Sequence, residues 1–200
     1  MMYNYDAFFS YKRHPLTDRW HRELMQRLQL WISQELAKPN LAMFFDSQSI
    51  DNGHDFAASI ADALRNSAIL ICVFSPLYFT SAHCLSEINA FLDREQMLKL
   101  KLGQLIACAR FHDGDRYPDL YRRMQSIDFS DFANPSPRFW ETEKGAQFEE
   151  VIRQFAQQVA AKIRMAPEPR ADFPTSFFEG DVSAFAGRIR RPLDYLQTAS

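Results

Sequence analysis

Short apolar runs alternate along the chain with stretches whose apolar residues recur every three or four positions. The runs have the length of buried strands and end in polar residues, and they cover 5–11, 41–45, 68–74 and 105–109. Only apolar side chains occur at 68–74, which predicts a central strand buried on both faces. An edge strand is expected near 126–129, within a region of loops.

The stretches between these runs have the periodicity of helices that turn one apolar face toward a core. The predicted helices cover 20–36, 56–64, 82–100 and 148–163. Pro39 and Asn40 end the first of them, and Ser81 or Thr80 can cap the third. The chain therefore alternates strand and helix over most of its length.

Strands and helices that alternate at this interval form right-handed βαβ units. We therefore predict an α/β fold, a doubly wound flavodoxin-like parallel sheet of four to five strands flanked by helices. One domain is expected over 1–165. Residues 166–200 contain four of the ten prolines and a cluster of arginines, and we expect a C-terminal extension that is partly ordered or serves as an oligomerisation arm.

Composition narrows the class of protein. With 200 residues, of which 46% are apolar and 24% charged, the chain has the size and composition of one globular domain. The formal net charge of -2 provides no overall attraction for nucleic acid or an anionic membrane. No apolar run approaches the roughly 18 residues of a membrane span, and no signal peptide is evident, so we expect a cytoplasmic protein. Three widely spaced cysteines predict reduced thiols.

Polar residues gather in three loops that follow predicted strands, at 10–14, 46–53 and 81–87. Ligands bind beyond the carboxyl ends of the strands in such sheets, so these loops define the candidate site. In the third loop, Ser81, Cys84 and Glu87 are spaced three apart and lie along one side of a helix start. Spacing alone also allows ordinary roles for them: a helix cap, a small core residue and a solvated carboxylate near the positive helix end.

Several segments between Asp6 and Glu87 resemble, in order and spacing, the motifs of TIR domains. Residues 6–11, Asp-Ala-Phe-Phe-Ser-Tyr, resemble the box that opens these domains, although an aliphatic residue usually stands at the position of Phe9. Residues 44–53 resemble the second strand of the family and its BB loop. Further matches are Phe74-Ser75-Pro76 and the Ser-x-x-Cys-x-x-Glu motif of TIR domains that consume NAD+, here Ser81, Cys84 and Glu87.

The resemblance implies an enzyme that cleaves the nicotinamide–ribose bond of NAD+, with Glu87 as the catalytic residue. The implied products are ADP-ribose, cyclic ADP-ribose or a transferred ADP-ribosyl group. NAD+ is the substrate in this interpretation, and neither a cofactor nor a metal is implied. One carboxylate is chemically sufficient, because nicotinamide leaves as a neutral base and needs no general acid, whereas a glycosidase needs two carboxyl groups.

The same resemblance implies a set of substrate-binding residues. Lys12 and Arg13 would face pyrophosphate or ribose, with a solvated surface pair as the alternative. Asp46 would bind ribose or orient the BB loop. Tyr11 and Phe56 would stack on a base, with core packing as the alternative for Phe56. The complete predicted binding set is Tyr11, Lys12, Arg13, Asp46, Asp51, Gly53, Phe56, Ser81 and Cys84.

Resemblance to free-standing bacterial TIR proteins implies a part in antiphage defence, by NAD+ depletion or by production of a nucleotide signal. It also implies self-association into dimers or filaments, and a downstream effector or upstream sensor as a partner. The main alternative is a non-catalytic TIR adaptor that acts through TIR–TIR contacts, although animal TIR adaptors typically lack the glutamate. A nucleotide-binding module of flavodoxin-like architecture is a third option.

Overall fold

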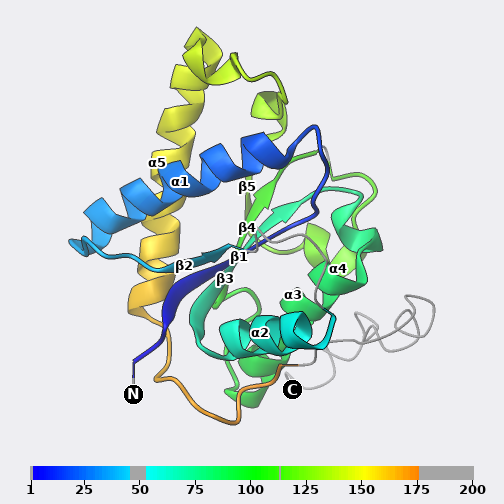
Figure 1. Ribbon diagram of the computed structural model, residues 1–200, viewed down its shortest axis with the longest axis vertical. Coiled ribbons are helices and arrows are strands. Elements are labelled where there is room, and N and C mark those ends of the chain that lie inside the picture. The colour runs from blue at the N-terminus through cyan, green and yellow to red at the C-terminus, as the bar shows by residue number, and fades with distance from the viewer. Residues whose placement is uncertain (1, 46–52, 113, 176–200) are drawn as a thin grey trace.

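The computed structural model describes residues 2–45, 53–112 and 114–175, with 53–57 described by their backbone. Within these ranges the chain forms one parallel sheet with helices on both faces (Figure 1). The strands are β1 (Tyr5–Tyr11), β2 (Met43–Phe45), β3 (Ser67–Phe74), β4 (Ile106–Arg110) and β5 (Ser126–Asp128). Their spatial order is β2-β1-β3-β4-β5, the flavodoxin-like order, which confirms the predicted fold class.

The strand predicted to be central, β3, lies in the middle of the sheet. It pairs in parallel with β1 on one side and β4 on the other, so that Phe9, Ile71 and Ala107 stand in register across three strands. Every residue of β3 is buried. A strand with neighbours at both edges and helices over both faces favours apolar side chains, which explains the sequence of 68–74. The first residue, Ser67, is polar, and its hydroxyl donates to the carbonyl oxygen of Ala63 at 2.7 Å.

The helices form two separate layers (Figure 1). On one face, α1 (Asp18–Leu36) and α5 (Glu143–Arg164) lie side by side. The other face carries α2 (Gly53–Arg65), α3 (Ala82–Met97) and the short α4 (Asp119–Arg122). Single-turn 3₁₀ helices connect these elements: η1 (Tyr78–Thr80), η2 (Ser130–Phe132) and η3 (Phe139–Glu141). No helix within the described ranges is long and apolar enough to cross a membrane.

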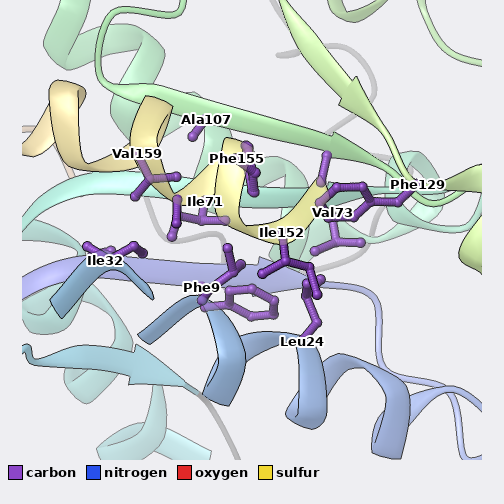
Figure 2. Packing of buried hydrophobic residues seen from close by; sticks show 14 of the residues in the cluster. Phe9, Leu24, Ile32, Ile71, Val73, Ala107, Phe129, Ile152, Phe155 and Val159 are labelled. Carbon is purple, nitrogen blue, oxygen red and sulfur yellow. The ribbon is translucent and has the colours of Figure 1, made fainter. Parts of the chain in front are cut away.

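Alternation along β1 divides its side chains between two cores. Ala7, Phe9 and Tyr11 belong to the core under α1 and α5, whereas Phe8 belongs to the core under α2 and α3. The first core is shown in Figure 2, where strand side chains meet those of the helices: Phe9, Leu24, Ile71, Ile152 and Phe155. The face to which a β1 residue points therefore decides which helices it can reach.

The charged residue near the start of β1 has a structural role. Asp6 is buried and forms an ion pair with Lys38, with 2.6 Å between Lys38 Nζ and Asp6 Oδ1. The other carboxylate oxygen accepts a hydrogen bond of 2.9 Å from the backbone N–H of Ala42. Asp6 thus holds the segment that enters β2 against β1.

The segment that follows α5 is part of the folded domain. Residues 166–175 (orange in Figure 1) run along the edge where the parallel strands begin. Tyr3 donates its hydroxyl to the carbonyl of Pro167 at 2.8 Å, and Arg65 donates to the hydroxyl of Thr175 at 3.2 Å. We call 166–175 the strap. The predicted C-terminal extension thus begins with a segment that contacts the domain, and 176–200 lie outside the described residues.

Phe173 of the strap completes a cage around a buried arginine. The guanidinium of Arg94 stacks between Phe173 and Phe91, with 4.2 Å from its central carbon to each ring centroid. It donates to the carbonyl oxygens of Ser67 at 2.8 Å and Leu64 at 2.7 Å. Burial lowers the pKa of Arg94 to about 10, which still leaves it charged at neutral pH. The strap is thereby tied to the end of α2 and the start of β3.

The structure corrects the sequence predictions at the ends of several elements. Ser81 stands before the first residue of α3, but its side chain forms no capping hydrogen bond to the helix backbone. The third helix ends at Met97, since Lys99 has a left-handed backbone with φ of 55°. The second strand begins at Met43 and is shorter than predicted. The short helix α4 lies in a region predicted as loops, because one turn is too short to create a periodic pattern.

All three cysteines are free and buried, as predicted. Burial raises the pKa of Cys72 and of Cys108, and both side chains belong to the core under α2 and α3. These thiols stay protonated at neutral pH and are structural residues.

Candidate active site

Glu87 lies in the first turns of α3 and points toward the end of β1. Its side chain is 9% exposed, and its Oε2 accepts a hydrogen bond of 2.5 Å from the hydroxyl of Ser10. Since β1 ends at Tyr11, the carboxylate stands at the edge where ligands bind in sheets of this order. The alternative of a solvated surface carboxylate is therefore wrong, and Glu87 is a buried acid at the carboxyl edge of the sheet.

A group of buried hydroxyl and thiol side chains surrounds this carboxylate. The Ser10 hydroxyl lies 2.8 Å from the hydroxyl of Tyr78, and Tyr78 is fully buried. The same Tyr78 oxygen lies 3.2 Å from the carbonyl oxygen of Cys84 and 3.4 Å from Cys72 Sγ. Burial and the neighbouring thiols raise the pKa of Tyr78 well above its ordinary value, so its hydroxyl remains a donor.

The predicted motif of Ser81, Cys84 and Glu87 is assembled on one side of α3, as its spacing indicated. All three residues are buried, and Ser81 forms a side-chain hydrogen bond with Cys84. Burial and the charge of Glu87 raise the pKa of the Cys84 thiol, while Ser81 and the charge of Lys12 oppose that rise. The Cys84 thiol is therefore protonated and no nucleophile, and Lys12 lies close enough for its charge to act on this site.

Tyr11 lies on the other side of the sheet from Glu87. The Tyr11 ring packs nearly parallel to Phe45, at a centroid distance of 5.3 Å, and against His21, at 4.5 Å. Its hydroxyl donates to Asp18 at 2.8 Å, and the charge of Arg13 acts on both Tyr11 and Asp18. A substrate-stacking role for Tyr11 stays a prediction, and this placement favours a core role.

The remaining predicted site residues follow the second strand. Asp46 and Asp51 lie outside the described residues. Gly53 is the first residue of α2, and Phe56 belongs to the same helix with its side chain outside the described part. Their assignments to substrate binding stay predictions.

Ser10 and Tyr78 are the site residues that sequence reasoning missed. Ser10 belongs to the opening box and to the loop at 10–14, and Tyr78 follows the Ser-Pro pair, but neither is in the predicted binding set. Strand alternation is the signal that finds Ser10, because a residue next to Tyr11 points to the opposite face. No short-range pattern links Tyr78 to Glu87, since η1 brings it there only in the folded chain.

The sheet order and the buried carboxylate at its carboxyl edge define a flavodoxin-like α/β protein with a candidate acid site. A family model described as TIR domain matches residues 8–143, which is more than half of the chain. The chain belongs to the TIR domain family.

Proteins similar to this chain include a receptor and the TIR domains of a resistosome. Toll-like receptor 4 of Pinctada imbricata is 31% identical over 87 residues, which cover 44% of this chain and 9% of that receptor. The chain thus spans less than a tenth of the length of this relative. The TIR domains of the activated Roq1 resistosome, which directly recognises the pathogen effector XopQ, align with 95% of this chain and 99% of theirs, at 18% identity and a TM-score of 0.39. The fold itself is established by the strand order of this chain.

Proposed function

We propose that this protein cleaves the nicotinamide–ribose bond of NAD+, as a glycohydrolase or an ADP-ribosyl cyclase, with Glu87 as its catalytic residue. The observation that carries the proposal is the placement of Glu87, which is buried at the carboxyl edge of the sheet and hydrogen-bonded by Ser10. Membership of a family that includes NAD-cleaving enzymes supports it. A solvated glutamate would give no such support.

The reaction requires little of the protein beyond positioned charge. As the C–N bond breaks, its electron pair moves to the ring nitrogen and nicotinamide leaves as a neutral base. The ribosyl carbon then carries positive charge shared with the ring oxygen, and a carboxylate in a partly dry site stabilises that charge. In hydrolysis, water attacks the same carbon and gives up a proton, which Glu87 can accept. In cyclisation, a ring nitrogen of the adenine attacks instead, and the adenine gives up a proton from its amino group.

Lys12 is the candidate contact for the pyrophosphate. It is half-buried, and its charge acts on Cys84, one turn from Glu87. An ammonium group whose charge acts on this site can meet the phosphates of a dinucleotide whose nicotinamide ribose lies at Glu87. The net charge of the chain is slightly negative, so it does not attract an anionic substrate as a whole. The proposed contact with Lys12 provides that attraction locally.

We further propose that the enzyme acts in the cytoplasm as part of bacterial antiphage defence, either by depleting NAD+ or by making a nucleotide signal for an effector. Self-association through TIR–TIR contacts belongs to this proposal. It rests on the family of the chain and on analogy with TIR proteins of bacteria.

The direct test is to incubate the purified protein with NAD+ and to separate nicotinamide, ADP-ribose and cyclic ADP-ribose by chromatography. We expect nicotinamide to appear, and we expect Glu87→Gln and Glu87→Ala to reduce its rate by at least about 100-fold. Glu150→Gln is the matched control, because Glu150 is an exposed carboxylate on α5. Its rate should equal that of the wild type.

Two results would overturn the proposal. Full turnover by folded Glu87→Gln protein would remove Glu87 from the mechanism. If concentrated wild-type protein self-associates and releases no nicotinamide, the chain is a non-catalytic adaptor.

A further inference from the structure

A hydroxyl from a distant part of the chain donates a hydrogen bond to Glu87. Ser10 lies at the end of β1 and is 1% exposed, and its oxygen is 2.5 Å from Glu87 Oε2. Behind it, 2.8 Å away, stands the hydroxyl of Tyr78 from η1. Three separate elements, β1, η1 and α3, thus contribute one residue each to a chain of polar groups.

The direction of the hydrogen bonds in this chain follows from counting protons. An ionised carboxylate only accepts, so the single hydroxyl hydrogen of Ser10 is directed to Glu87. Ser10 is then an acceptor toward Tyr78, and the Tyr78 hydroxyl shares its single hydrogen between Ser10, at 2.8 Å, and the carbonyl oxygen of Cys84. The other neighbours of the Tyr78 oxygen, Cys84 carbonyl and Cys72 Sγ, are farther away at 3.2 and 3.4 Å.

We propose that Ser10 is a positioning residue for Glu87, and that Tyr78 orients Ser10 from behind. A hydrogen bond from Ser10 holds the carboxylate in one rotamer and favours its charged form, which burial would otherwise disfavour. The proposal rests on the proposed function, because the charged carboxylate is the form that stabilises a cationic ribosyl centre.

Ser86 provides a matched control within the same helix. It precedes Glu87 directly, is 1% exposed, and its hydroxyl oxygen has no hydrogen-bond partner within the described part of the chain. Ser86→Ala therefore removes a buried hydroxyl beside Glu87 without interrupting the chain from Tyr78 to Glu87. Ser10→Ala removes a hydroxyl of the same size and does interrupt it.

The test compares Ser10→Ala, Tyr78→Phe and Ser86→Ala by their steady-state kinetics with NAD+ over a range of pH. For Ser10→Ala we expect kcat to fall about 10- to 100-fold, because one charge-assisted hydrogen bond to Glu87 is lost. KM should stay within about twofold of the wild type. The acid limb of its pH profile should move up by about one pH unit. Tyr78→Phe keeps the ring and should show a smaller loss of the same kind, and Ser86→Ala should match the wild type.

Ser10→Ala with wild-type kcat and pH profile would overturn the proposal. So would an equal loss in Ser86→Ala, since the effect would then be one of general core structure. If Ser10→Ala fails to fold, Tyr78→Phe tests the proposal instead. The acid limb of its pH profile must then move up, and an unchanged profile would overturn the proposal.

A titration without turnover separates this proposal from the proposed function. With ¹³C-labelled glutamate carboxyl groups, the signal of Glu87 is identified by its absence in Glu87→Gln, and its midpoint is followed by NMR in wild type and Ser10→Ala. A higher midpoint in Ser10→Ala supports the positioning role even if the wild type fails to cleave NAD+. An unchanged midpoint overturns it even if NAD+ is cleaved.

Discussion

At the residue scale, His21 is a histidine that the fold keeps neutral. It is 4% exposed, its ring stacks on Tyr11, and its Nδ1 lies 2.8 Å from the carbonyl oxygen of Thr17. Burial lowers the pKa of His21 to about 4, while the hydrogen bond to Thr17 and the charge of Asp18 oppose this shift only in part. The imidazole therefore takes up its proton far more readily in the unfolded chain than in the folded one.

The resulting pH dependence has a definite sign. Between pH 6.5 and 4 the unfolded state binds more protons at His21, so its contribution to stability is present above pH 6.5 and is lost as pH falls to about 4. The wild type should lose unfolding free energy between pH 7 and pH 4. We expect His21→Phe, which keeps an aromatic ring, to lose less over the same range, by up to about 3 kcal/mol. Urea denaturation at both pH values measures this difference.

His14→Gln is the control for that measurement, because His14 is exposed. This substitution should leave the pH dependence of the unfolding free energy as in the wild type. Equal acid sensitivity in wild type and His21→Phe would mean that His21 is protonated in the folded protein.

Prediction from sequence at this scale succeeded where a motif has a fixed spacing. Cys84 and Glu87 lie together because helix geometry places positions three apart on one side, and Ser81, just before the helix, joins them through its hydrogen bond with Cys84. The prediction was less informative for Tyr11 and Lys12, whose neighbours depend on the twist and edge of a sheet. Side chains that follow one another on a strand point to opposite faces, and Tyr11 and Ser10 illustrate how this separates residues of one motif.

At the scale of elements, the start of α5 requires a glycine. A Cβ atom added at Gly145 would lie 2.5 Å from the carbonyl oxygen of Phe139 and 2.9 Å from Trp140 Cα, both in η3. The backbone N–H of Gly145 donates to the hydroxyl of Thr142, which caps the helix at 3.1 Å. The absence of a side chain allows η3 and α5 to pack at this distance.

Gly145→Ala should therefore destabilise the protein, although alanine is the better helix former by about 1 kcal/mol. We expect a net loss of about 1 to 3 kcal/mol, because the methyl group meets backbone atoms that cannot rotate away. Thermal unfolding measures it. Gln147→Ala, at an exposed position of the same helix, should change stability little, and an increase in stability for Gly145→Ala would contradict the close contact.

Long elements were predicted well and short ones poorly. α1 and α5 extend over many turns, so their apolar faces repeat often enough to be recognised. α4 and the 3₁₀ helices contain one turn each, and their formation depends on contacts with the rest of the molecule. η1 belongs to this group, and with it the placement of Tyr78 in the site.

At the scale of the whole molecule, the strap closes the domain at the edge opposite Glu87. We expect Phe173→Ala to lower the unfolding free energy by about 3 kcal/mol and the Tm by roughly 6 to 12 °C, because Phe173 is 2% exposed and covers one side of Arg94. Met165→Ala is the control, since Met165 is 59% exposed, and it should unfold near the wild-type temperature. A Tm of Phe173→Ala equal to that of the control would show that the strap adds no stability.

The architecture could be predicted because the alternation of strands and helices restricts a chain of this length to few topologies. The strap could not be predicted in this way. Its proline-containing sequence has no periodic pattern, and its docking depends on one aromatic residue meeting a cation that is distant in sequence, Arg94.

The hydrogen bond between Tyr3 and Pro167 joins the residues before β1 to the start of the strap. Both segments lie where the strands begin, while Glu87 lies where β1 ends. A partner domain fused before Tyr3 would thus be tethered on the side of the domain away from the acid.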